Sequence, residues 1–283
     1  MKVSIVTPSL NQGPYIRATI DSVLSQGYPE LDYVVLDGGS TDETIDILRS
    51  YGPALSWRSE PDAGQADAIN RGFATAGGEL IGWLNADDVY LPGAIAAMVD
   101  AAAAAVGPDP ALIYGGAEFI DAAGTPLGPC THVRPYSRAA LLNELDFIVQ
   151  PATLFSRTAF EAVGGLDATL RYCFDYDLWL KLSERYPVAY LARTLAQVRL
   201  HATTKTSTGG LARLDEIERM VGRHGRSRIP SGFYGQMARA RRNAAWAALR
   251  GWRLGEAFRQ LGSGASYVGA HLVGMVRGRR TSG

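Results

Sequence analysis

The segment SEPDAGQADAINRGFATAGGELIGWLNADD, residues 59–88, has the pattern that best indicates the fold. Its central part carries apolar side chains at helical spacing, at Ala66, Ile69, Phe73 and Ala76. The pair Gly77-Gly78 ends this predicted helix, and the apolar run at 80–84 is typical of a buried strand. A polar tetrapeptide, Asn85-Ala86-Asp87-Asp88, follows directly. A helix that leads through a short turn into a buried strand predicts a βαβ unit in a parallel sheet.

The same alternation extends in both directions from this segment. Strand-like apolar runs lie at 3–7, 33–36 and 55–58. Helical patterns lie at 16–24, at 41–48 and from Pro92 to about Val106. Alternating strands and helices with short connections predict an α/β fold, with a mostly parallel central sheet and helices on both of its faces.

The second half of the chain is less regular. Further strands and a helix are predicted within 111–160, an amphipathic helix at 175–186, and strands at 188–191 and 197–200. From Leu211 onward the pattern is helical and increasingly basic. Three tryptophans fall on strand or helix patterns and are expected in the core, namely Trp57, Trp83 and Trp179.

Four loops should meet at one edge of the sheet, because ligands of parallel α/β sheets bind beyond the carboxyl ends of the strands. They contain Thr7-Pro8-Ser9, Asp37-Gly38-Gly39-Ser40, Glu60-Pro61-Asp62 and Asn85-Ala86-Asp87-Asp88. Clustered carboxylates suit Mn²⁺ or Mg²⁺ on a diphosphate, although acids also favour a helix N-terminus such as the one near Pro92. Asp37 is similarly open to two interpretations, as a turn residue or as an acceptor for a base or ribose.

The composition excludes several classes of protein. The chain has 283 residues, 47% of them hydrophobic, which is enough for a core and excludes wholesale disorder. A formal charge of zero hides an asymmetry, since residues 236–283 hold nine Arg, no Lys and one acid, for +8, and residues 1–235 carry −8. The two cysteines, Cys130 and Cys173, are too few for a disulfide scaffold or a cysteine zinc cluster.

Signals for other activities and locations are missing from the sequence. It has no G-x-G-x-x-G and no G-x-x-x-x-G-K-[ST], so hydride transfer and nucleotide hydrolysis lose their usual support. The first apolar run is too short for a signal peptide, and no run reaches the roughly 18–20 apolar residues that span a bilayer. We therefore expect a cytoplasmic protein.

Four sequence blocks occur in order across residues 3–182: TPSLNQGPYIRATIDSVLSQ at 7–26, VVLDGGSTDET at 34–44, the segment at 59–88, and FDYDLWLKL at 174–182. Together they resemble the inverting glycosyltransferases of family two, which have a GT-A fold. The resemblance implies a GT-A catalytic domain over 1–210, with a nucleotide-sugar-binding half at 1–106 and an acceptor-side half at 107–210. Residues 211–283 would form a basic helical C-terminal extension.

The resemblance also implies a donor site and a metal site. The residues expected at the nucleotide sugar are Thr7, Pro8, Ser9, Asn11, Asp37, Asp62, Gln65, Arg71, Asn85, Ala86, His201 and Lys205. The family's Asp-x-Asp motif matches Asn85-Ala86-Asp87, which makes Asp87 the main ligand of Mn²⁺ or Mg²⁺. Asp88 is the second choice of ligand, and His201 is a further candidate. Asn85 departs from the motif by losing a charge, which bears on the affinity for the metal and on its identity.

The general base of the family lies at the start of a helix, usually as Glu-Asp, and the match here is Phe174-Asp175. The resemblance gives this role to Asp175, which would take the proton from an acceptor hydroxyl. An N-cap role is the competing interpretation of Asp175, and Asp177 is the second choice of base. One carboxylate as base and one as metal ligand imply a single displacement with inversion.

These inferences predict a hexosyltransferase that moves a sugar from a nucleotide-diphosphate donor, with UDP expected, to a hydroxyl acceptor. The acceptor would be a carbohydrate or a lipid-linked molecule in surface polysaccharide or glycolipid synthesis. Two alternatives stay open. A sugar nucleotidyltransferase would want a Gly-rich, basic phosphate loop, which Gly38-Gly39 does not supply. A non-catalytic nucleotide-sugar-binding module is favoured by Asn85 and Phe174.

The basic tail combines many arginines with Trp246, Leu249 and Phe258. An Arg-rich helix with aromatic side chains can lie in an anionic membrane interface, which would place the protein peripherally on the inner face of the membrane. A helical bundle packed on the domain and a homo-oligomer contact are equally open. No nucleic-acid partner is expected, because nothing in the sequence indicates readout of bases.

Overall fold

The computed structural model describes residues 1–105, 107–202, 204–226, 228–250 and 254–278. It divides into two compact units. The first comprises Met1–Tyr136 and Phe147–His201, and the second comprises Ser137–Asp146 and Ala202–Gly283. The division falls after His201, whereas the sequence places the end of the catalytic domain at 210. Val106, the predicted end of a helix and of the first half, lies outside the described residues.

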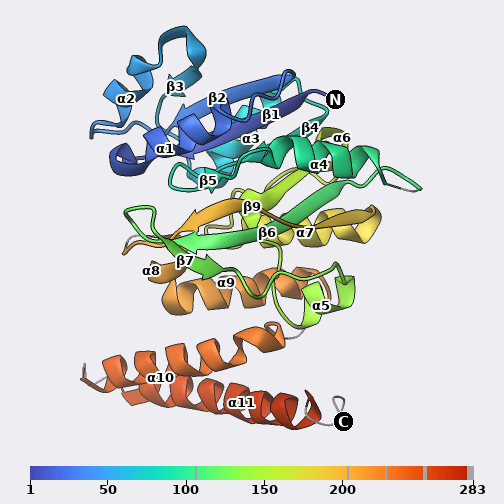
Figure 1. The fold of residues 1–283 in the computed structure, drawn as a ribbon. Coiled ribbons are helices and arrows are strands. Elements are labelled where there is room, and N and C mark those ends of the chain that lie inside the picture. The colour runs from blue at the N-terminus through green and yellow to red at the C-terminus, as the bar shows by residue number, and fades with distance from the viewer. Residues whose placement is uncertain (106, 203, 227, 251–253, 279–283) are drawn as a thin grey trace. The chain divides into compact units, whose positions relative to one another are not determined.

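Among the described residues, nine strands of the first unit form one sheet in the order β3-β2-β1-β4-β8-β6-β9-β5, with β7 paired to β6 (Figure 1). The strands are β1 (Val3–Ser9), β2 (Leu31–Asp37), β3 (Ser56–Ser59), β4 (Leu80–Trp83), β5 (Val89–Tyr90), β6 (Leu112–Ile120), β7 (Pro126–Pro129), β8 (Thr153–Ser156) and β9 (Val188–Arg199). Neighbouring strands from β3 to β4 are parallel, so their carboxyl ends share one edge. Antiparallel β8 then joins β4 to β6.

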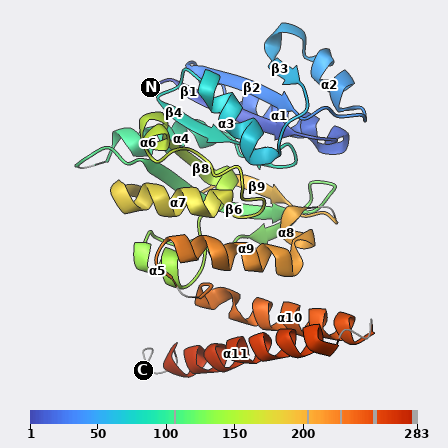
Figure 2. The ribbon, with the colours of Figure 1, turned by 180° about the vertical axis from the view of Figure 1, so that it is seen from behind.

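Helices cover both faces of this sheet, which confirms the predicted fold class (Figures 1 and 2). One face carries α1 (Gly13–Leu24), α2 (Thr44–Ser50) and α4 (Ala94–Ala103), and the other carries α3 (Gln65–Thr75), α6 (Arg157–Ala162) and α7 (Phe174–Arg185). The first face packs aliphatic side chains such as Ile5, Ile20 and Met98. The second is aromatic, and Trp83 of β4 stacks on Trp179 of α7 with ring centroids 5.8 Å apart.

Two of the tryptophans predicted in the core are fully buried, Trp83 and Trp179. Trp57 is half-buried and packs against the aliphatic face. The two strands predicted at 188–191 and 197–200 form one strand, β9. Its register against β6 slips near Gly115 and Gly116, and residues 192–194 are exposed there, which explains why the apolar pattern breaks in the sequence.

Helix α3, which lies within the segment 59–88, is very close to β1. A Cβ atom on Gly72 would be 2.7 Å from both methyl groups of Val6, so only glycine permits this approach. The helix starts after Gly64, whose φ of +120° is available to glycine. These two glycines place the first turn of α3, with Gln65, at the edge where the strands end.

The second unit is helical, as predicted for the C-terminal extension. It contains α5 (Arg138–Asn143), α8 (Lys205–Thr208), α9 (Gly210–Arg223), α10 (Tyr234–Arg250) and α11 (Leu254–Gly278). Helices α10 and α11 pack side by side as an antiparallel hairpin (Figure 1). Arg241 of α10 forms a 2.8 Å ion pair with Asp215 of α9. Within the described parts of the chain, none of the helices has the length and hydropathy needed to cross a bilayer.

Candidate active site

Asp37 ends β2 beside Ser9 of β1, and its carboxylate closes the turn that follows. Its Oδ2 accepts hydrogen bonds from the backbone N–H groups of Gly39 (3.0 Å) and Ser40 (2.8 Å) and from the Ser59 hydroxyl (2.7 Å). The Ser40 hydroxyl donates to the other oxygen. Asp37 is only 2% exposed. It therefore has the turn role in this structure, and Oδ1 keeps capacity for one further donor.

The loop after β1 is fixed against the loop after β2. Thr7 is buried, and its hydroxyl lies 3.0 Å from that of Tyr33, so its side chain belongs to the core. Asn11 has a positive φ of 52°, its N–H donates to the Ser40 hydroxyl (2.7 Å), and its Oδ1 accepts from Thr41 N–H (2.9 Å). The buried Ser9 hydroxyl has no hydrogen-bond partner among the described residues.

A cavity of about 540 Å³ lies between β2, β3 and α3. It brings together three of the predicted donor-binding residues, Asp37, Asp62 and Arg71. Arg71 is ion-paired with Glu60, and a Cβ atom on Gly38 would lie 2.9 Å from Asp62 Oδ2. The absence of a side chain at position 38 thus allows the loop that carries Asp62 to approach β2.

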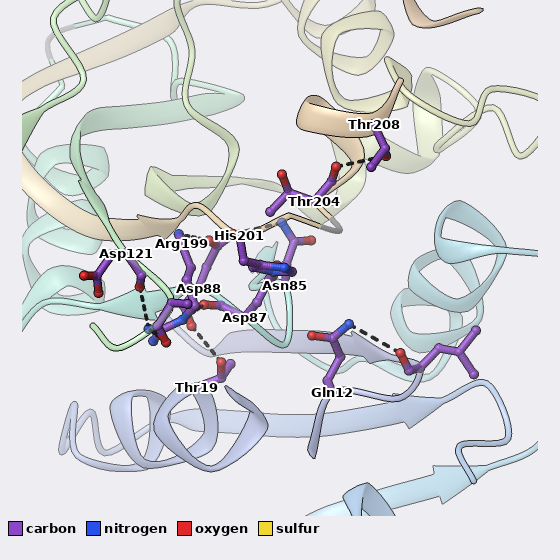
Figure 3. Close-up of polar contacts among 12 residues, drawn as sticks. Gln12, Thr19, Asn85, Asp87, Asp88, Asp121, Arg199, His201, Thr204 and Thr208 are labelled. Carbon is purple, nitrogen blue, oxygen red and sulfur yellow. Dashed lines mark hydrogen bonds and ion pairs between the residues drawn. The ribbon is translucent and has the colours of Figure 1, made fainter. Parts of the chain in front are cut away.

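Asn85, Asp87, Asp88 and His201 do not line this cavity but form a separate cluster at the end of β4 (Figure 3). Asn85 sits in an amide network. Its Oδ1 accepts from Gln65 Nε2 (2.7 Å), and its Nδ2 donates to Asp88 Oδ2 (3.0 Å) and to Gln150 Oε1 (3.1 Å). Gln150 in turn donates to the Trp83 carbonyl (2.7 Å). Both ends of the Asn85 amide are therefore held by the protein.

Asp87 and His201 form the second part of this cluster. His201 Nε2 lies 2.9 Å from Asp87 Oδ2, although the two residues are 114 positions apart in the chain. The ring of Tyr15 packs on that of His201, with centroids 4.8 Å apart. Among the described residues, no group of three or more His, Cys, Asp or Glu side chains forms a metal site by itself. Asp87 and His201, both predicted at the metal, nevertheless place a carboxylate oxygen and an imidazole nitrogen next to each other.

Asp88 is buried and held by the protein at both oxygens. Its Oδ1 accepts from the backbone N–H of Arg199 (3.0 Å), and its Oδ2 accepts from Asn85. Burial, and then the charge of Asp87, raises the pKa of the Asp88 carboxyl well above its usual range, while Arg199 and Asn85 oppose this shift. These bonds support a structural role rather than the second-choice metal role.

Sequence reasoning missed three residues of the cluster: Tyr15, Gln150 and Arg199. The Arg199 guanidinium lies 5.2 Å from the Tyr15 ring centroid, and it donates to the backbone carbonyls of Asp87 (2.9 Å) and Asp121 (3.1 Å) (Figure 3). One signal was available in the sequence. Gln150 and Arg199 are polar residues inside mostly apolar runs, FIVQPATLF and LAQVRL, and buried polar residues need partners.

Asp175 lies in the first turn of α7, half-buried, and its Oδ1 accepts from the N–H of Tyr176 (2.8 Å). The preceding Phe174 packs against Trp83, with ring centroids 6.1 Å apart. Since Trp83 ends β4, this contact brings the start of α7 to the end of the strand that precedes Asn85 and Asp87. Asp177, the second choice of base, is buried and ion-paired with Lys181 at 2.6 Å.

The other predicted residues fall outside these clusters. Ala86 and Pro8 are buried. Lys205 is exposed and begins α8 of the second unit, so its role toward the donor stays a prediction.

Comparisons with known proteins identify the family. The family profile described as Glycosyl transferase family 2 matches residues 4–164. An uncharacterized glycosyltransferase of Rickettsia prowazekii is 32% identical over 221 residues, which cover 76% of this chain and 69% of that protein. One of Mycobacterium tuberculosis is 29% identical over 181 residues, covering 63% of this chain and 68% of that protein.

Solved structures share the fold at low sequence identity. A mannosyltransferase from Pyrobaculum calidifontis, PcManGT, in complex with GDP-Man and Mn²⁺, has a TM-score of 0.61 at 18% identity, over 97% of this chain and 79% of that one. S. aureus TarS 1-349 in complex with UDP-GlcNAc has a TM-score of 0.56 at 13% identity, over 93% and 91%. With the GT-A fold and the family profile in agreement, this chain belongs to glycosyl transferase family 2.

Proposed function

We propose that this glycosyltransferase moves a sugar from a UDP-sugar to a hydroxyl group on a carbohydrate or lipid-linked acceptor, with inversion, in surface polysaccharide or glycolipid synthesis. The observation that carries the proposal is the Asp87–His201 pair at the end of β4, beside the start of α7 with Asp175. Two fold neighbours, described with UDP-GlcNAc and with GDP-Man, support a nucleotide-sugar donor. The cavity with Asp37, Asp62 and Arg71 supports a place for its nucleoside.

The residues at the end of β4 suit a divalent cation shared with a diphosphate. Asp87 Oδ2 and His201 Nε2 are one carboxylate and one imidazole ligand, and the Asp88 and Asn85 side chains are bonded elsewhere. Cations of this kind often take few protein ligands and complete their coordination with phosphate oxygens and water. Since imidazole favours transition metals, we propose Mn²⁺ rather than Mg²⁺. A bound cation there would neutralise charge on the leaving diphosphate.

The chain's own residues supply the proton acceptor. Asp175 would take the proton from the acceptor hydroxyl as that oxygen attacks the anomeric carbon of the donor sugar. The bond to the diphosphate breaks in the same step, which inverts the configuration. The stack of Trp83 on Trp179 and the packing of Phe174 on Trp83 hold the start of α7 in place for this role.

The metal assignment is tested with Asp87→Ala. We expect Mn²⁺-dependent binding of UDP, measured by calorimetry, to weaken at least tenfold, because one of two protein ligands is lost. Asp46→Ala is the matched control, since Asp46 is an exposed acid on α2 and should leave binding unchanged. Unchanged affinity in Asp87→Ala would remove the metal assignment.

The base assignment is tested with Asp175→Asn. Donor binding should be retained while turnover falls by about 10²–10⁴, because only the proton acceptor is lost. The assay is release of UDP with a panel of UDP-sugars and acceptors. Retained turnover in the variant would make Asp177, the second choice, the candidate base. Donor binding by the wild-type chain without turnover on any acceptor would favour the non-catalytic module.

A further inference from the structure

The α10–α11 hairpin exposes large apolar side chains. Four lie on these two helices, with exposed fractions of 59% for Trp246, 72% for Phe258, 45% for Leu261 and 49% for Val268. Phe258, Leu261 and Val268 recur at spacings of three and seven along α11, so they share one face of that helix. Exposed apolar side chains gathered on one face indicate an interaction surface.

A groove of about 450 Å³ runs between the two helices on this face. Small residues line it, together with Leu261, Val268, Arg239 and Arg242. Trp246 follows Arg242 by one helical turn and so continues the stripe of α10 that lines the groove. Phe258 precedes Leu261 by one turn and continues the stripe of α11.

The register of the hairpin brings the two aromatic side chains to the same end. Arg241 bonds Gln260 at 3.2 Å, and the rings of Tyr234 and Tyr267 are 5.7 Å apart. This antiparallel register places Trp246 level with the start of α11, close to Phe258. The two most exposed aromatic side chains of the hairpin therefore extend the groove at one end.

Arginines surround this apolar surface. Where the structure describes the exposure of side chains on the two helices, the exposed arginines are Arg239, Arg242, Arg250 and Arg259. Arg242 and Arg250 lie one turn before and one turn after Trp246, and Arg259 adjoins Phe258. Residues 236–283 contain a single acid, Glu256. The surface thus combines aromatic and aliphatic groups with a dense positive charge and almost no opposing charge.

We propose that the α10–α11 hairpin docks on an anionic lipid bilayer, with Trp246 and Phe258 in the interfacial layer and the arginines against lipid phosphates. The charge of this surface distinguishes a lipid bilayer from a second copy of this chain as its binding partner. A second copy that met this one hairpin to hairpin would bring Arg239 and Arg242 against like charges, with Glu256 as the single acid of residues 236–283. An anionic leaflet attracts each cation, and aromatic side chains partition into the headgroup layer. The inference goes beyond the proposed reaction and would hold for any acceptor.

The experiment is flotation of the full chain with vesicles of phosphatidylcholine alone or with added phosphatidylglycerol. We expect binding to the anionic vesicles only, weakened by salt. Arg239→Gln with Arg242→Gln should lower the partition coefficient about fivefold for each arginine. Trp246→Ala with Phe258→Ala should lower it at least tenfold.

Two single variants serve as matched controls. Leu127→Ala removes an equally exposed apolar side chain, 58% exposed on β7, and Arg49→Gln removes an exposed arginine on α2. Both should bind vesicles like the wild type, and all variants should keep the wild-type unfolding temperature because the changed side chains are exposed.

Three outcomes would overturn the proposal. The first is equal binding of wild type and hairpin variants to anionic vesicles. The second is a dimer, seen by analytical ultracentrifugation, that the Trp246→Ala and Phe258→Ala changes dissociate while vesicle binding persists, which would make a second copy the occupant. The third is binding of a DNA duplex as tight as that of the vesicles. Donor binding should be wild-type in every hairpin variant, so this test is separate from that of the reaction.

Discussion

Asn85→Asp restores the family's Asp-x-Asp motif in the sequence, yet the structure predicts that it weakens the protein. The Nδ2 group of Asn85 donates to Asp88 Oδ2 at 3.0 Å and to Gln150 Oε1 at 3.1 Å. Aspartate replaces this donor by an oxygen, so three acceptors face one another without a proton between them. One of them, the Asp88 carboxylate, is only 4% exposed.

The expected loss can be worked from these contacts. Each of the two lost hydrogen bonds contributes about 1 kcal/mol, and the buried acceptors they leave are poorly solvated. Repulsion between the new carboxylate and Asp88 adds about 1 kcal/mol, because two carboxylates at hydrogen-bond distance resist ionising together. We expect about 3 kcal/mol less free energy of unfolding, a large part of the 5–15 kcal/mol typical of a domain.

Urea unfolding at pH 7, followed by tryptophan fluorescence, measures this loss. Asn85→Ala is the first control, since it removes these two hydrogen bonds and the one accepted from Gln65 without adding a charge, and it should lose about 3 kcal/mol. Asn85→Asp combined with Asp88→Asn is the second, because the exchanged amide can donate to the new carboxylate and should recover much of the stability. If Asn85→Asp unfolds like the wild type and binds UDP with Mn²⁺ more tightly, Asn85 is simply a weakened metal ligand.

Two further predictions concern the packing of the first unit. Burial lowers the pKa of His132, so the unfolded chain takes up a proton at higher pH than the folded one. Stability should therefore fall as the pH drops below about 6.5, and thermal unfolding of His132→Gln between pH 5 and 7.5 should show a flatter profile. Gly72→Ala should lower the free energy of unfolding by about 1–3 kcal/mol, because the new methyl group clashes with Val6. Gly222→Ala on α9 is the control and should raise it by up to about 1 kcal/mol, because the space around Gly222 is open. Equal unfolding midpoints of the two variants would contradict the tight contact at Gly72.

Local patterns predicted most of the first half of the fold. The helix and strand of residues 59–88 follow from apolar spacing and from the glycines that end them, so α3 and β4 lie close to their expected positions. The meeting of Asp37 and Asp62 follows from the rule that parallel strands end at one edge, whereas Arg71 on α3 was expected there only from the family resemblance. The second part of the sheet, which includes β6, β8 and β9, was harder to predict, because pairing between strands far apart in the chain produces no periodic pattern in the sequence.

The amide network and the Arg199 contacts could not be predicted. Gln150 meets Asn85 across 65 positions, and Arg199 meets the Asp87 carbonyl across 112, so only tertiary packing brings them together. The alternatives for Asp37 also could not be separated by residue type. A carboxylate that closes its own turn and one that binds a nucleoside have the same sequence. Only the structure shows that four donors around Asp37 give it the first role, and the second role stays a proposal.

The contacts of the cluster explain why position 85 holds asparagine where the family's motif has aspartate. Asp88 is buried and fixed by the Arg199 N–H, so a third carboxylate at position 85 would lie beside a charge that burial already disfavours. The amide supplies a donor to Asp88 instead, and Gln65 and Gln150 fix its orientation. Asp87 is then the acid of this loop left to face a ligand, with His201 next to it. With Asn85 and Asp88 bonded within the protein, the proposed metal site depends on Asp87 and His201, which the departure at position 85 leaves in place.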